Sequence, residues 1–173
     1  MIWQYILTAI SAALFFGFVA LCWAKYGLKD CYSAYGPAWA KTPPFSWYLN
    51  PWCFVTGGTA AMLIPVMLET TVGSVWQFTG FLCPAILIFV ALTPDYGKDK
   101  LANVMHQIGA KGAALWAVLF IIFNAPSLWW LLVLYIALAG ICTLAFGKWS
   151  WCFWAEMAAY LGIYTAVFIM ISK

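Results

Sequence analysis

The sequence predicts an all-α, polytopic membrane protein with six transmembrane helices. Of its 173 residues, 66% are hydrophobic and 8% are charged, whereas soluble domains carry about 25% charged residues. Apolar runs of about 20 residues, the length that crosses a hydrocarbon core of about 30 Å, recur along the whole chain. These runs are continuous rather than alternating with polar residues, which favours helices over barrel strands.

The six predicted helices form a single domain over residues 1–173. The first run begins at Ile2 without a basic segment or an Ala-x-Ala-like site, so we expect a retained helix rather than a cleaved signal peptide. Pro94 ends the third helix, and Pro65 and Pro84 lie inside helices that they should bend. The expected helices cover about residues 2–23, 52–71, 75–93, 102–123, 128–146 and 149–171.

Lysine placement predicts the orientation of these helices. Six helices put every loop lysine on one side of the membrane, in the first, third and fifth loops, and leave Lys173 on the other side. Positive residues favour cytoplasmic loops, so we expect a bacterial inner-membrane protein with both termini outside the cytoplasm. The sequence contains no arginine, which argues against nucleic-acid binding.

The polar chemistry of the chain is concentrated in residues 93–114. This segment holds the only histidine, His106, together with Asp95, and Glu156 lies about two turns into the last predicted helix on the same side. We expect these three residues to converge as candidate catalytic groups in a cup open to the cytoplasm, because a carboxylate beside an imidazole fixes its tautomer and supports acid–base chemistry. Two alternatives stay open. In the first, His106 has no catalytic role and only hydrogen-bonds a neighbouring helix or a lipid headgroup. In the second, Asp95 only supports a turn.

The long first loop is too aromatic for a flexible linker and should lie in the membrane interface or fold back over the cup. We expect Tyr32 and Ser33 from this loop, with Lys111 and Tyr160 from the helices, to contribute ligand-binding groups. Small residues recur at helical spacing on several helices. Such faces let helices approach closely, either within one chain or in a homo-oligomer.

Six cysteines are scattered along the chain without a CxxC motif or a Cys/His pair at metal spacing. We expect them to be free thiols that pack as small apolar side chains. The residue pattern therefore predicts no metal site and no cofactor.

Three motifs spread over most of the chain carry a family resemblance. They are KYG and YSAY at 25–27 and 32–35, PD and MHQIGA at 94–95 and 105–110, and WAE and AY at 154–156 and 159–160. They resemble a family of short bacterial membrane proteins that is more remotely similar to the CREST superfamily of alkaline ceramidases and PAQR receptors. The resemblance implies that Ser33, Asp95 and His106 match the serine, aspartate and first histidine of that pattern. It also implies a zinc site, although the superfamily uses three histidines and this chain has one.

Three functions follow as expectations. The first is a membrane protein that binds a lipid, a small amphiphile or a membrane partner in the cytoplasm-facing cup. The second is a pore or transporter subunit in a homo-oligomer. The third, which rests on the resemblance, is a membrane-embedded, metal-assisted lipid hydrolase.

Overall fold

The computed structural model describes residues 2–45, 49–93 and 100–173, and the described chain is helical without strands. Each of the six predicted apolar runs forms a helix. The α-helices are α1 (Ile2–Tyr26), α2 (Tyr35–Ala40), α3 (Pro51–Thr70), α4 (Phe78–Ala91), α5 (Lys100–Asn124), α6 (Trp129–Phe146) and α7 (Trp151–Ile171), and short 3-10 turns cover η1 (Tyr32–Ala34), η3 (Pro126–Leu128) and η4 (Lys148–Ser150).

Within the described residues, five helices are long and apolar enough to cross a membrane: α1, α3, α5, and α6 and α7 together with the turns that precede them. The remaining apolar helix, α4, has 14 residues and is therefore about 21 Å long, shorter than a hydrocarbon core of about 30 Å. It begins at Phe78, three residues later than predicted, because Ser74 to Gln77 form turns. The structure thus supports a membrane protein with five spanning helices by length and composition, and the sixth crossing stays a prediction.

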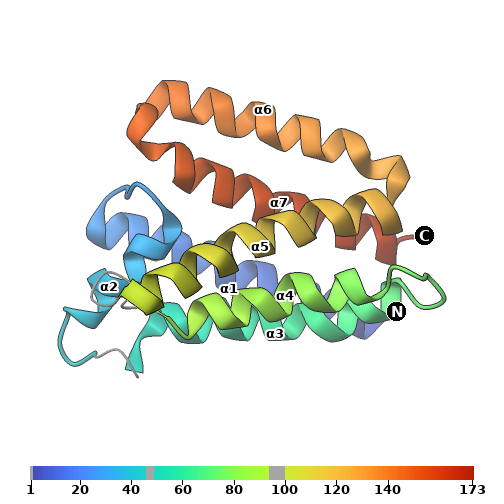
Figure 1. The fold of residues 1–173 in the computed structure, drawn as a ribbon, viewed down its shortest axis with the longest axis horizontal. Coiled ribbons are helices and arrows are strands. Elements are labelled where there is room, and N and C mark those ends of the chain that lie inside the picture. The colour runs from blue at the N-terminus through green and yellow to red at the C-terminus, as the bar shows by residue number, and fades with distance from the viewer. Residues whose placement is uncertain (1, 46–48, 94–99) are drawn as a thin grey trace.

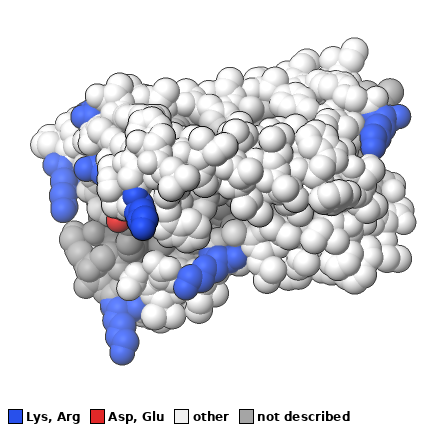
Figure 2. Space-filling model, turned by 90° about the horizontal axis from the view of Figure 1, so that it is seen from above, with Lys and Arg blue, Asp and Glu red and all other residues white. Residues whose placement is uncertain are grey.

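The long helices run up and down in one bundle, and the two termini lie at the same end of it (Figure 1). Tyr5 Oη donates a hydrogen bond of 2.9 Å to Ser172 Oγ, which joins the first and last helices at this end. Lys173 Nζ lies here as well, 3.2 Å from Ser127 Oγ in η3. Figure 2 shows most lysine side chains at the opposite end of the molecule. We call that opposite end, where α1 ends and α3, α5 and α7 begin, the lysine end.

Pairs of neighbouring helices differ in how extensively they contact each other. Extensive contacts join α3 to α4, α4 to α5, α1 to α3 and α6 to α7. Helix α6 lies on the outside of the bundle (Figure 1), and Leu131 is the single buried residue along it. Helix α7 carries the longest set of buried residues and contacts α1, α3 and α5 as well as α6. The core therefore lies around α7 and not around α6.

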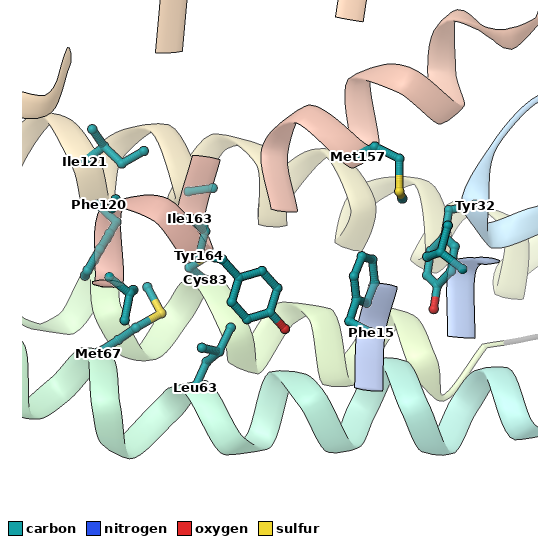
Figure 3. Packing of buried hydrophobic residues seen from close by; sticks show 14 of the residues in the cluster. Phe15, Tyr32, Leu63, Met67, Cys83, Phe120, Ile121, Met157, Ile163 and Tyr164 are labelled. Carbon is teal, nitrogen blue, oxygen red and sulfur yellow. The ribbon is translucent and has the colours of Figure 1, made fainter. Parts of the chain in front are cut away.

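The core combines aromatic rings with methionine and aliphatic side chains (Figure 3). The ring of Phe15 on α1 stacks on Tyr160 of α7, with centroids 3.8 Å apart. Nearby, Ser11 Oγ donates to the carbonyl of Thr59 at 2.9 Å and lies 2.7 Å from Tyr164 Oη. These contacts bring α1, α3 and α7 together along one seam.

The described residues of the first loop pack against α1, α3 and α7 at the lysine end. Sequence patterns missed α2 within this loop, because a six-residue helix depends on packing. Trp39 of α2 is buried against Phe18, and Lys25 Nζ lies 3.9 Å from the centre of the Trp39 ring. Buried Asn50 donates to the carbonyl of Gly36 at 2.7 Å, and its side-chain oxygen also caps α3.

Candidate functional site

A partly open cavity of about 310 Å³ lies between η1, α3, α4, α5 and α7. Its volume falls at the lower end of the range found for small-molecule sites. Polar side chains from four of these elements line one part of it: Tyr32, Ser33, Thr56, Gln107, Lys111 and Glu156. Apolar side chains line the rest, among them Leu63, Met67, Cys83, Ala113, Ala117 and Ile163.

The polar and apolar parts of this cavity lie at different depths. Helix α3 starts at the lysine end, so Thr56 is near that end and Met67 is eleven residues, or about 16 Å, farther along the helix axis. Helices α5 and α7 start at the same end, so Lys111 precedes Ala117 on α5 and Glu156 precedes Ile163 on α7. Trp151, Cys152 and Ala155 line the cavity still nearer to that end. The cavity is therefore amphipathic, with a polar mouth at the lysine end and an apolar interior toward the middle of the bundle.

Glu156 lies at the junction between the first loop and α7. Its Oε2 accepts a hydrogen bond from the backbone N–H of Tyr32. A second bond, from the backbone N–H of Phe153 to the carbonyl of Asp30, measures 2.9 Å. These two bonds dock residues 30–32 against the first turns of α7 and so form one wall of the cavity mouth.

Tyrosine side chains form the wall beside Glu156. Tyr32 Oη lies 2.9 Å from Thr56 Oγ1, and its ring centre is 6.1 Å from that of Tyr160. Burial raises the pKa of the Tyr32 phenol well above its ordinary value. Tyr32 therefore stays neutral at physiological pH and keeps a hydroxyl group at the mouth.

Five of the residues predicted from sequence share this cavity: Tyr32, Ser33, Lys111, Glu156 and Tyr160. Among the described residues that line this cavity, His106 is absent. His106 is buried, its Nδ1 lies 3.2 Å from Thr93 Oγ1, and its ring centre is 6.4 Å from that of Trp52. The structure thus places His106 at the junction of α3, α4 and α5 rather than at the mouth.

Asp95 lies outside the described residues, so its predicted approach to His106 and Glu156 stays a prediction. Over residues 2–45, 49–93 and 100–173, no group of three His, Cys, Asp or Glu side chains is arranged to hold a metal ion. The described residues therefore provide no ligand set for a zinc site.

Two cysteines that sequence reasoning left as isolated thiols are neighbours. None of the six cysteines is in a disulfide; Cys22 and Cys83 are buried, and the other four are partly exposed. A backbone hydrogen bond joins the adjacent residues Phe153 and Asp30, and the interaction with Cys152 lowers the pKa of Cys31. Cys31 Sγ also lies 3.2 Å from Ser33 Oγ. No sequence signal pairs residues this far apart, because the contact arises from docking the first loop on α7.

A second, larger hollow of about 660 Å³ lies between α5, α6 and α7. Its lining is mostly apolar, and its polar side chains are Tyr135, Thr143 and Lys148. Ala114, Ala155 and Ala159 line both this hollow and the amphipathic cavity. Trp151 and Ile163 of α7 line both spaces as well, so residues of α5 and α7 separate them.

No family model, no curated protein and no solved structure matches this chain. The resemblance to the CREST superfamily accordingly stays a prediction.

Proposed function

We propose that this protein binds a lipid or a small single-chain amphiphile in the amphipathic cavity, with the polar group at the lysine end and the apolar chain directed into the bundle. The observation that carries this proposal is the match between the order of the lining residues and the order of groups in an amphiphile. Apolar side chains bury a ligand chain, and a small number of polar groups fix its orientation.

The chemistry of the mouth favours a headgroup with both an acceptor and a donor. Lys111 supplies a cation for a phosphate or carboxylate. Glu156 supplies carboxyl oxygens for an ammonium or hydroxyl group, and Ser33 and the Tyr32 phenol add hydroxyls. In the bacterial inner membrane with the orientation predicted from lysine, this mouth faces the cytoplasmic leaflet, where such headgroups are present.

A photoreactive phospholipid tests the proposal directly. The full chain, reconstituted in nanodiscs that contain a phospholipid with a diazirine on its acyl chain, is irradiated and mapped by peptide mass spectrometry. We expect labelled residues on the interior part of α3, around Leu63 and Met67, in addition to labels on the outer surface of the bundle.

Ala110→Phe provides the blocking variant, because Ala110 is half-buried and lines the amphipathic cavity without lining the second hollow. Its ring should occupy the space next to Lys111 and lower interior labelling several-fold. Ala137→Phe is the matched control, since Ala137 is exposed on α6. Labelling confined to the outer surface, or interior labelling that Ala110→Phe leaves unchanged, would refute the proposed function.

A further inference from the structure

We propose that Cys31 and Cys152 are a thiol pair that reacts with small-molecule disulfides and closes into an intramolecular disulfide, which fastens the first loop to α7 at the mouth of the cavity. The proposal is independent of the ligand that the cavity binds. It rests on how two backbones and two side chains are held together.

The backbones on either side of the pair are joined directly. The N–H of Phe153 donates to the carbonyl of Asp30 at 2.9 Å, and each of these residues is next to one of the two cysteines. One residue farther along the loop, the N–H of Tyr32 donates to Glu156. The chain segments that carry the two thiols are therefore fixed side by side from two directions.

The two thiols also interact, because Cys152 is the side chain that most strongly lowers the pKa of Cys31. Neither cysteine is in a disulfide and both are partly exposed, so a dissolved disulfide can reach them. A disulfide requires its two Cα atoms to lie within about 7 Å, and the hydrogen bonds that flank the two cysteines hold their chain segments close together.

The surroundings also activate one of the thiols. The hydrogen bonds from Cys152 and Ser33 outweigh burial and the nearby Asp30 carboxylate, and they lower the pKa of Cys31 from 9.0 to about 6. Glu156 is the other acid that faces this sulfur. A thiolate, and not a thiol, is the nucleophile in disulfide exchange, so Cys31 attacks first and Cys152 resolves.

The exchange balances in two steps. The Cys31 thiolate attacks one sulfur of a small disulfide RSSR, forming a Cys31–SR mixed disulfide and releasing RS⁻. Cys152 then loses its proton and attacks the Cys31 sulfur, which forms the Cys31–Cys152 bond and releases a second RS⁻. The protein loses two electrons and two protons in total, and RSSR is reduced to two RSH.

Closure would act on the cavity, because Cys152 and Ser33 both line it. In the dithiol form the first loop is held to α7 by hydrogen bonds alone. In the disulfide form a covalent bond prevents the loop from leaving the mouth.

The test uses the full chain, reduced and purified in detergent micelles, then treated with oxidised glutathione. After an acid quench, denaturation and alkylation with a mass tag count the remaining thiols, and peptide mass spectrometry identifies the bond. We expect the number of thiols to fall by two from the six of the reduced chain. A cross-linked peptide should join residues 31 and 152.

Cys31→Ser and Cys152→Ser should each abolish the cross-link, and Cys152→Ser should leave a stable glutathione adduct on Cys31. Cys142→Ser is the matched control, because Cys142 is also partly exposed but lies on α6, and its variant should still form the cross-link. Wild-type protein that keeps all six thiols, that stops at the glutathione adduct, or that joins other cysteines overturns the proposal.

Discussion

Replacing Glu156 by alanine should loosen the first loop without unfolding the bundle. Glu156 Oε2 is the acceptor for the Tyr32 N–H, and alanine leaves that donor without its acceptor. A hydrogen bond contributes about 1 kcal/mol when both groups are neutral and up to about 3 kcal/mol when one is charged. Since 1.4 kcal/mol corresponds to a tenfold change in an equilibrium constant, the open population of the loop should rise between about 5-fold and about 150-fold.

Hydrogen–deuterium exchange of the protein in nanodiscs measures this change. The exchange rate of the Tyr32 amide should increase by the same factor in Glu156→Ala, because exchange of a protected amide follows its local opening. Glu156→Gln should show a smaller increase, since the amide oxygen of glutamine still accepts a hydrogen bond. Amides in the middle of α7 should keep their protection in both variants.

Glu69→Ala provides the matched control, because Glu69 is an exposed acid near the far end of α3. It should leave the Tyr32 amide unchanged. If Tyr32 exchanges equally fast in wild-type protein and in Glu156→Ala, the carboxyl group does not dock the loop, and the proposed wall of the cavity mouth is wrong.

Two further predictions follow from the same structure. The lowered pKa of Cys31 means that its thiolate form is gained as pH rises through about 6, so the rate of its alkylation should reach half its maximum near that pH. Cys152→Ala, which removes the neighbouring thiol, should move this midpoint upward. A midpoint between 8 and 9 in the wild type would contradict the prediction. A Cβ at Gly109 would lie 2.7 Å from Val90 Cγ2, and the cost of this overpacking, about 1–3 kcal/mol, exceeds the gain of about 1 kcal/mol in helix propensity. Gly109→Ala should therefore lower the thermal midpoint of unfolding in detergent. Gly58→Ala should not, because there is open space around a Cβ at that position.

The helices and their direction follow from the sequence alone. A chain in lipid must satisfy its backbone hydrogen bonds within each apolar segment, so composition and length identify the helices. Lysines at the ends of those segments then indicate which helix ends lie together. The short helix α2 could not be predicted in this way, because its stability depends on burying Trp39 against its neighbours rather than on its own composition.

The grouping of polar residues followed from the sequence in part. Lys111 and Glu156 both lie one to three turns from the lysine end, and depth can be counted from helix boundaries at 1.5 Å per residue. Depth alone also grouped His106 with Glu156, yet the structure places His106 beside Thr93 and Trp52 and Glu156 beside Tyr32. The two residues share a level in the bundle but face different neighbours.

Only the tertiary structure decided which faces of these helices meet. In a soluble protein an apolar stripe shows which side of a helix is buried, but here lipid and core are both apolar, so nearly every face is hydrophobic and the pattern does not fix the rotation of a helix about its axis. That rotation, together with the docking of the first loop, brings Cys31 to Cys152 and opens the amphipathic cavity beside Glu156. The composition of the chain thus indicates a membrane protein, whereas the amphipathic cavity arises from packing between segments that are far apart in sequence.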